Sequence, residues 1–298
     1  MRTLVAEPDM VEMESPTLNS PHKARALWYV EPGRVELRPT EIFRNRADVL
    51  LRLIWSGISR GTERLVFRGQ VPPSEFERMR APLQEGAFPF PVKYGYCAVG
   101  RIEEADNAGL IGRLAFCLAP HQTQIAVPAG MVNLLPEGLS PRRAAIAANM
   151  ETALNAVWDS CAGPGDRIYV IGGGLLGLLV AHLCAGLPGA DVTLVDPQAA
   201  RAEQAQALGL HLVTPEACGA PQDGDVVFHA SASAVGLSSA LGCAGLEGKV
   251  IELSWYGAAE VGAPLGGAFH SQRLQLISSQ VGQISPSRRP RWSYARRM

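Results

Sequence analysis

The sequence predicts an α/β protein with two domains, in which a β-rich domain precedes a doubly wound parallel sheet. The chain has 298 residues, more than a single hydrophobic core usually fills. Short β-like runs separated by Gly and Pro dominate the first half, whereas apolar strands alternate with helical segments in the second half. The change between the two patterns predicts a domain boundary near residue 150.

The first domain is expected over residues 26–150. Its strand-like runs are rich in β-branched and aromatic residues, and Gly or Pro separates them, as in a distorted barrel. The runs are ALWYV (26–30), RVELR (34–38), DVLLRLIWSG (48–57), CAVGRIEEA (97–105) and RLAFCLAP (113–120). Residues 1–25 contain three prolines and show no periodicity, so we expect a flexible tail there.

The second domain is expected over residues 151–284. A helix is predicted to begin at Ser140, an N-cap that Pro141 follows. Beyond it the strand-like runs are continuously apolar, which is typical of buried parallel strands. They are DRIYVIG (166–172), DVTLVD (191–196), DVVFHAS (225–231) and KVIELSWYG (249–257). Residues 285–298 form a basic segment with five arginines, interpreted as a solvated tail or the exposed face of an incomplete helix.

The composition excludes several classes of protein. Lys and Arg number 27 and Asp and Glu 28, so no overall charge attracts the chain to nucleic acid or an anionic membrane. The six cysteines form no C-x-x-C pair, which argues against a zinc ribbon. Residues 168–190 carry no charge but contain six glycines, so a strand, turn and helix explain them better than a membrane span. With no secretory signal visible, we expect a cytoplasmic protein.

A glycine pattern in the second domain predicts a dinucleotide site. Gly172, Gly174 and Gly177 form G-x-G-x-x-G, with Leu175 and Leu176 between the last two glycines. The pattern directly follows an apolar strand and opens an apolar helix, as a dinucleotide site requires. The glycines permit a tight turn, a close approach of the backbone to a pyrophosphate, and close packing of the helix on the sheet.

An acidic residue at the end of the next strand favours NAD as the cofactor. Asp196 lies 19 residues after Gly177, where a carboxylate accepts hydrogen bonds from the adenosine ribose and repels a 2′-phosphate. Arg201 follows and either covers the adenine or is solvated. Since ligands of open α/β sheets lie beyond the carboxyl ends of the strands, Ser231, Ser254 and Tyr256 are further candidates for cofactor contact, with ordinary loop polarity as the alternative.

Three segments of the chain resemble landmarks of the medium-chain dehydrogenase/reductase family, and the resemblance extends over residues 26–284. They are WSGISRGTE (55–63), PVKYGYCAVGRIE (91–103) and METALNAVW (150–158). The resemblance implies a GroES-like catalytic domain followed by a Rossmann domain. WSGISRGTERLVFRG is similar to the branch that contains the bacteriochlorophyllide 3-hydroxyethyl dehydrogenase. Compared with the family, the chain looks short at its end, where a last helix and strand of the catalytic domain are expected.

The zinc ligands of the family are missing at the matching positions. Ser59 stands where zinc-dependent members have cysteine, and Tyr96 and Cys97 stand where they have histidine and glutamate. Glu151 matches the glutamate of the polyol branch. Because a catalytic zinc needs about three N, S or O ligands, we expect no metal.

Hydroxyl, imidazole and carboxyl groups are then expected to polarise the substrate and move its proton. The catalytic candidates are Ser59, Thr62, Tyr96, His121 and Glu151, and Glu63 is expected to point into the same cleft. Each also has an ordinary role open to it: a packed aromatic for Tyr96, a surface or hydrogen-bonded residue for His121, a small residue for Ser59 and a helix-capping charge for Glu151.

The leading hypothesis is an oxidoreductase that moves a hydride between NAD(H) and an alcohol or carbonyl substrate without zinc. One alternative is a zinc-free quinone or enone reductase that uses NADPH. Another is a non-catalytic NAD(H)-binding sensor or partner subunit. A homodimer is left open.

Overall fold

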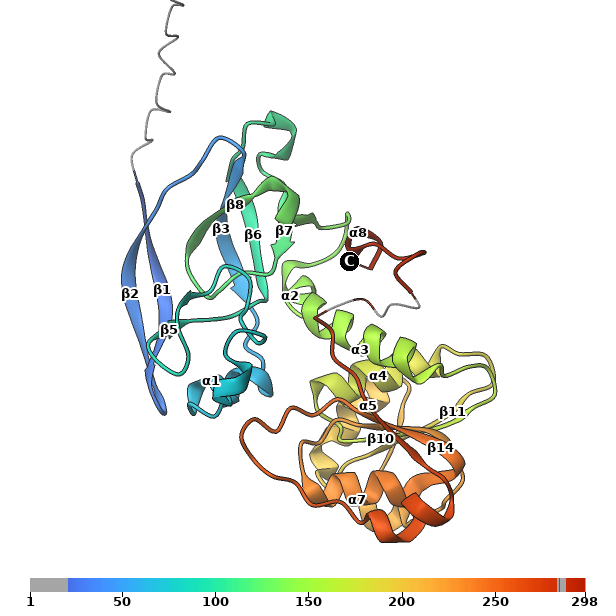
Figure 1. Cartoon of the computed structure of the whole chain (residues 1–298). Helices are drawn as coiled ribbons and strands as arrows, with labels where there is room; N and C mark the ends of the chain where they lie inside the picture. Colours follow the sequence, from blue (N-terminus) through green and yellow to red (C-terminus); the bar gives the residue numbers. More distant parts are fainter. Residues whose placement is uncertain (1–20, 283, 285–287, 298) are drawn as a thin grey trace, which may run out of the picture.

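Two antiparallel sheets make up the first half of the chain in the computed structural model, which describes residues 21–282, 284 and 288–297 (Figure 1). One sheet has the strand order β2-β1-β5-β4 and the other β8-β3-β6-β7-β9. Their strands are β1 (His22–Glu31), β2 (Arg34–Ile42), β3 (Asp48–Ser56), β4 (Glu85–Gly86), β5 (Val92–Lys93), β6 (Ala98–Glu104), β7 (Leu114–Cys117), β8 (Gln124–Pro128) and β9 (Asn133–Leu134). The short helix α1 (Thr62–Phe67) follows β3.

Strand β1 begins earlier than the sequence predicts. His22 lies opposite Ile42 in β2, and Ala24, which is buried, lies opposite Thr40. The boundary of the predicted tail at residue 25 is therefore wrong, because backbone pairing with β2 extends the strand to His22. Residues 1–20 of that tail lie outside the described residues.

The second half of the chain forms a six-stranded parallel sheet with the order β12-β11-β10-β13-β14-β15. Its strands are β10 (Arg167–Ile171), β11 (Asp191–Val195), β12 (His211–Val213), β13 (Gly224–His229), β14 (Ala244–Glu252) and β15 (Gln275–Ser278). The helices are α2 (Pro141–Ala144), α3 (Ala147–Ser160), α4 (Leu175–Ala185), α5 (Ala202–Ala207), α6 (Pro215–Cys218), α7 (Ala234–Cys243) and α8 (Tyr294–Arg297). The fold class that the sequence predicts is confirmed.

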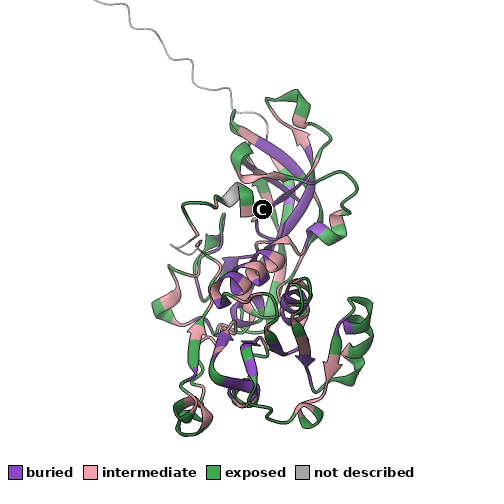
Figure 2. Cartoon of the chain, turned by 90° about the vertical axis from the view of Figure 1, so that its right-hand side faces the viewer, coloured by how far each residue is buried: buried purple, intermediate pink, exposed green. Residues whose placement is uncertain are grey.

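Helices cover both faces of the parallel sheet because its strand residues alternate in direction. Ile168 and Val170 of β10 join the core formed with α3, α4 and α5, whereas Tyr169 and Ile171 join the core formed with α7. Figure 2 shows the buried residues following the strands, with exposed residues on the connecting loops. None of the helices in the described ranges is long and apolar enough to cross a bilayer.

The end of the chain packs against α3 and is not a solvated tail over residues 288–297. The rings of Trp292 and Trp158 lie 4.5 Å apart, and the guanidinium of Arg288 lies 5.3 Å from the ring of Trp158. Arg297 forms an ion pair with Glu151, and both side chains are 6% exposed. The interpretation as a solvated tail is wrong there, because aromatic packing and a buried ion pair hold the segment to the helix (Figure 1).

A loop at the carboxyl edge of the parallel sheet contacts the first half of the chain. After β14, the N–H of Ala258 donates to the carbonyl of Gln70 at 3.1 Å. A Cβ at Gly257 would lie 2.5 Å from the same oxygen, so only glycine permits this approach. Trp255 packs against a hydrophobic cluster, which includes Phe88 and Tyr94, and Tyr96 contacts the same cluster. The carboxyl edge of the sheet is thereby joined to the surroundings of α1 and Tyr96.

Candidate functional site

The turn between β10 and α4 tolerates no side chain at two of its glycines. Gly172 has φ +110°, and a Cβ there would lie 2.8 Å from the backbone nitrogen of Ser231. A Cβ at Gly177 would lie 1.8 Å from the carbonyl oxygen of Gly172. Of the two leucines, Leu175 is exposed and Leu176 packs against the core. The turn thus lies directly at the start of α4, where unpaired N–H groups favour an anion.

Asp196 follows β11 and is 4% exposed. Its carboxylate accepts from the N–H of Gly173 at 2.7 Å and from the N–H of Gln198 at 2.8 Å. Arg201 donates to the same carboxylate at 3.1 Å. A Cβ at Gly174 would lie 3.4 Å from that guanidinium. The structure therefore brings both residues to the glycine turn, with Arg201 paired to Asp196 rather than solvated.

Ser231, Ser254 and Tyr256 belong to one hydrogen-bonded network around a buried histidine. His229 is fully buried, with Nδ1 2.7 Å from Glu252 Oε2 and Nε2 2.7 Å from Ser231 Oγ. The Tyr256 hydroxyl donates to Glu252 at 3.1 Å, and the N–H of Ser254 donates to the same carboxylate at 2.7 Å. The sequence reasoning missed His229 and Glu252, although each is the polar last residue of an apolar strand, a signal that could have identified them.

Two hydroxyl groups, those of Ser59 and Tyr96, stand at positions where the family resemblance implies zinc ligands, and the hydroxyl of Thr62 lies beside them. The Ser59 and Thr62 side chains lie close enough to the Tyr96 hydroxyl to lower its pKa. Burial has the larger effect and raises the pKa of Tyr96 to about 12, although these two side chains act in the opposite direction. Tyr96 therefore keeps its proton at neutral pH and can donate it.

His121 lies beside this hydroxyl cluster and is bound to Glu63. Its Nε2 lies 2.6 Å from Glu63 Oε2, and its Nδ1 forms a hydrogen bond with Ser56. Glu63, which is 1% exposed, also accepts from the Tyr29 hydroxyl and the N–H of Ser59, each at 2.8 Å. Sequence reasoning missed Tyr29 and Ser56, because only the folding of the chain brings Tyr29 of β1 to Glu63 and Ser56 of β3 to His121.

The sequence predicts that Glu151 acts together with the hydroxyl cluster, but its carboxylate has another partner in the structure. It lies in α3, and its carboxylate is paired with Arg297 from the end of the chain. Burial raises the pKa of Glu151, and the Arg297 guanidinium opposes this shift. A proton relay through Glu151 is therefore not supported, because a buried guanidinium holds the carboxylate.

The donor set around Tyr96 does not fit a zinc ion. Ser59, Thr62 and Tyr96 present hydroxyl groups, and burial raises the pKa of the neighbouring Cys97 thiol to about 12. Zinc binds the thiolate form of cysteine and neutral imidazole far better than hydroxyl groups. Within the described ranges, no three His, Cys, Asp or Glu side chains gather closely enough to hold a metal ion.

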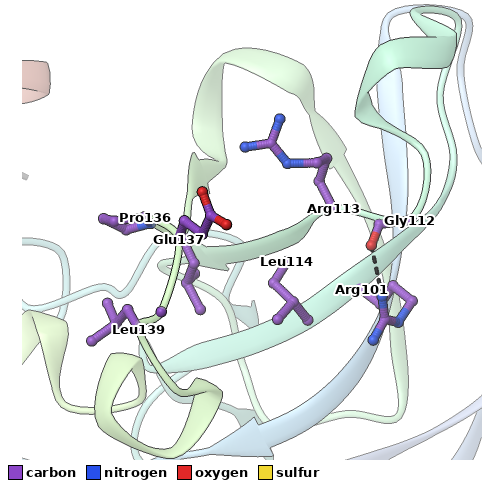
Figure 3. A pocket seen from close by; sticks show the side chains of 9 residues that line it. Arg101, Gly112, Arg113, Leu114, Pro136, Glu137 and Leu139 are labelled. Carbon is purple, nitrogen blue, oxygen red and sulfur yellow. Dashed lines mark hydrogen bonds between the residues drawn. The ribbon is translucent and has the colours of Figure 1, made fainter.

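A surface pocket on the first half of the chain contains none of the predicted site residues (Figure 3). Its lining combines two arginines and a glutamate with apolar and glycine positions, and Arg101 donates to the carbonyl of Gly112 at 2.7 Å. The lining residues are Arg101, Gly112, Arg113, Leu114, Leu135, Pro136, Glu137, Gly138 and Leu139. The pocket and the hydroxyl cluster are separate features.

Comparison with known proteins supports the fold. No family model matches the chain. An uncharacterized zinc-type alcohol dehydrogenase-like protein of Haemophilus influenzae is 27% identical over 169 residues, which cover 53% of this chain and 48% of that protein. The chain thus spans about half the length of the curated relatives it matches.

Solved structures agree with the chain over most of its length. A putative zinc-binding dehydrogenase from Sinorhizobium meliloti bound to NADP has a TM-score of 0.71 at 20% identity, covering 87% of this chain and 84% of that one. The chain shares its fold with this dehydrogenase. A short chain alcohol dehydrogenase from Escherichia coli, complexed with NADH, gives 0.68 at 14% identity and covers 90% of this chain and 86% of that one.

The residues around the glycine turn fit a nicotinamide dinucleotide. Gly172 and Gly177 leave a cradle that a Cβ would fill, and the start of α4 offers N–H groups to a pyrophosphate. Asp196 and Arg201 lie at the same turn, within reach of the adenosine ribose in this type of site.

Proposed function

We propose that the chain is an oxidoreductase that transfers a hydride between NAD(H) and an alcohol or carbonyl substrate, without a catalytic zinc. The observation that carries this proposal is the cluster of Ser59, Thr62 and Tyr96. The loop after β14, which contains Trp255, joins this cluster to the carboxyl edge of the parallel sheet, where the glycine turn lies. Zinc-type alcohol dehydrogenase-like relatives support the same class of reaction.

Tyr96 is the proposed proton donor to the substrate oxygen. A carbonyl that accepts a hydride develops negative charge on oxygen, and a hydrogen-bond donor in a water-poor site stabilises that charge. The Ser59 and Thr62 hydroxyls can donate to the phenolate that remains after the transfer. In the oxidation direction the same group takes the proton back.

Glu63 and His121 position this donor. A Cβ at Gly95 would lie 2.8 Å from the His121 ring, so the imidazole lies directly against the residue before Tyr96. The Glu63 carboxylate fixes both the imidazole and the N–H of Ser59. In this proposal they hold Ser59 and Tyr96 in place and do not touch the substrate.

The cofactor in this proposal is bound by the glycine turn and Asp196. A bound nicotinamide supplies or accepts the hydride at the substrate carbon. Asp196 favours NAD(H), whereas the Arg201 guanidinium beside it is the feature that could accept a 2′-phosphate. Ser254 and Tyr256, beyond the end of β14, are the proposed contacts near the nicotinamide.

The test is a titration of the purified chain with NADH and with NADPH, followed by turnover of a panel of secondary alcohols and ketones with and without a chelator. We expect tighter NADH binding and turnover that is insensitive to the chelator. Binding without any turnover would support the sensor alternative. Turnover of enones with NADPH would support the reductase alternative, and inhibition by the chelator would contradict the zinc-free mechanism.

A further inference from the structure

Ser231, His229 and Glu252 are connected in the order that activates a serine hydroxyl. The Ser231 oxygen lies 2.7 Å from Nε2 of the imidazole, and Nδ1 lies 2.7 Å from the Glu252 carboxylate. Ser231 is exposed, whereas His229 has no exposed surface. A nucleophile, a base within hydrogen-bond reach and a third group that orients the base are the features of nucleophilic catalysis.

The charge on Glu252 sets the proton positions in this group. Burial alone would raise the pKa of Glu252, but the hydrogen bonds from His229 and Ser254 act in the opposite direction, and the pKa is lowered. An ionised carboxylate only accepts hydrogen bonds, so it selects the imidazole tautomer with a proton on Nδ1. Nε2 then presents its lone pair to the Ser231 hydroxyl.

The Ser231 hydroxyl lies against the first turn of α7. A Cβ at Gly236 would lie 2.0 Å from Ser231 Oγ and 2.9 Å from His229 Nε2, so this turn needs glycine for the three groups to fit. The N–H groups of Ala234 and Val235 open the helix, and groups at that position have no acceptor within the helix. They are available to an oxyanion formed next to Ser231.

We propose that the chain also hydrolyses short carboxylic esters, with Ser231 as the nucleophile, His229 as general base and acid, and Glu252 as the residue that orients the imidazole. Ser231 Oγ forms a bond to the ester carbonyl carbon while its proton passes to His229 Nε2. The imidazole returns this proton to the leaving alkoxide, which departs as the alcohol. Water then attacks the acyl-serine through the same imidazole, releasing the acid and restoring the serine.

The experiment uses the full chain without added cofactor, p-nitrophenyl acetate as the substrate and a fluorophosphonate as the covalent probe. We expect hydrolysis above the spontaneous rate and one label per chain, located on Ser231 by peptide mass spectrometry. Ser231→Ala should reduce hydrolysis to the spontaneous rate, and His229→Gln should reduce it at least about tenfold.

A matched control is Ser238→Ala, which removes another exposed hydroxyl, one bonded to the carbonyl of Ala234 within α7. It should leave both hydrolysis and labelling unchanged. A label on Ser56 or any other residue would overturn the proposal, as would hydrolysis that survives in Ser231→Ala or an intact chain that neither hydrolyses the ester nor takes up the probe. Because no NAD(H) is needed, hydrolysis at Ser231 supports this proposal even if the redox proposal fails.

Discussion

Each half of the chain holds a serine, a histidine and a glutamate in one hydrogen-bonded group. The first group is Ser56, His121 and Glu63, and the second is Ser231, His229 and Glu252. In both groups the histidine is buried and the serine is exposed. The residue types are the same, so their surroundings decide what each group can do.

The two carboxylates have different partners. Glu63 accepts from the His121 ring, the Tyr29 hydroxyl and the N–H of Ser59, and it is 1% exposed. The side chain of Glu252 is 14% exposed and lies at the edge of the sheet. Each carboxylate accepts from three groups, but the donors to Glu63 come from three separate parts of the chain, whereas those to Glu252 come from His229 and from the nearby residues Ser254 and Tyr256.

The backbone near the two serines also differs. Beside Ser56, the N–H of Gly57 donates to Cys97 and the N–H of Ser59 donates to Glu63. Beside Ser231, the first turn of α7 has N–H groups without an acceptor in the helix. Identical side chains thus support different chemistry, because an activated serine also needs free donors for the oxyanion.

The largest effects are expected on the rates of the two proposed activities, carbonyl reduction and ester hydrolysis, which depend on different residues. Tyr96→Phe removes the proton donor and should lower carbonyl reduction by about 10²- to 10⁴-fold, since that is the usual contribution of a positioned acid. Ester hydrolysis should not change in this variant. Ser231→Ala should abolish ester hydrolysis, and any fall in carbonyl reduction should match the change in NADH affinity measured by fluorescence, because Ser231 adjoins the glycine turn. Loss of both activities in either variant would mean that the two sites are not independent.

The second prediction concerns the stability that each carboxylate contributes. Glu63→Ala leaves the Tyr29 hydroxyl, the His121 ring and the Ser59 N–H without an acceptor that is 1% exposed, and should lower the free energy of unfolding by about 3–5 kcal/mol. Glu252→Ala leaves the His229 ring, the Tyr256 hydroxyl and the Ser254 N–H without their acceptor, but at a more exposed carboxylate, and should cost about 1–3 kcal/mol. Urea unfolding followed by circular dichroism measures both values. Equal losses would contradict the structural role assigned to Glu63.

The third prediction concerns the pH dependence of the free energy of unfolding, to which Tyr29 beside Glu63 and Tyr256 beside Glu252 contribute. Burial and the Glu63 charge raise the pKa of Tyr29 above its ordinary 10.0, and burial and the Glu252 charge raise that of Tyr256 to about 12. Above pH 10 the unfolded chain loses phenol protons that the folded chain retains. The free energy of unfolding therefore falls as pH rises, by about 1.4 kcal/mol per pH unit for Tyr29.

Urea unfolding at several pH values between neutral and about pH 11 tests this dependence. Tyr29→Phe and Tyr256→Phe should each make the alkaline decrease less steep by a similar amount, because both raised pKa values lie above this pH range. Neither variant should alter the pH dependence below pH 10, where both states keep these protons. An unchanged alkaline slope in Tyr29→Phe would show that its proton is not held by the fold.

The smallest effect is expected from the serines themselves. Ser56→Ala and Ser231→Ala each remove an exposed hydroxyl and should change the free energy of unfolding by no more than about 1 kcal/mol. Thermal unfolding of both variants beside the unaltered chain checks this. A much larger loss in Ser231→Ala would indicate that its hydroxyl has a structural role.

Local patterns were sufficient to predict the parallel sheet and the glycine turn. The apolar run before Gly172 had to be a buried strand, and no residue with a side chain fits at Gly177. The same local reasoning placed Asp196 after the second strand of the sheet. Such features depend on neighbouring residues, so sequence alone can reveal them.

Long-range pairing is what local patterns could not predict. The Glu151 carboxylate is paired with Arg297, which lies far along the chain. The local sequence around Arg297 predicts only a solvated tail or the exposed face of an incomplete helix. Similarly, Tyr29 reaches Glu63 only because β1 folds beside α1. No spacing in the sequence encodes these contacts, since they depend on how separate elements pack.

The sequence by itself determined the two-domain α/β fold and the form of the glycine turn, because apolar periodicity and the absence of side chains act over short distances. Only the tertiary structure decided the partners of the titratable groups. His229 and Glu252 come from different strands and meet at the carboxyl edge of the parallel sheet, where the strand register places them opposite one another. The burial of each histidine and the groups that are hydrogen-bonded to its ring, rather than the residue type, then determine its chemistry.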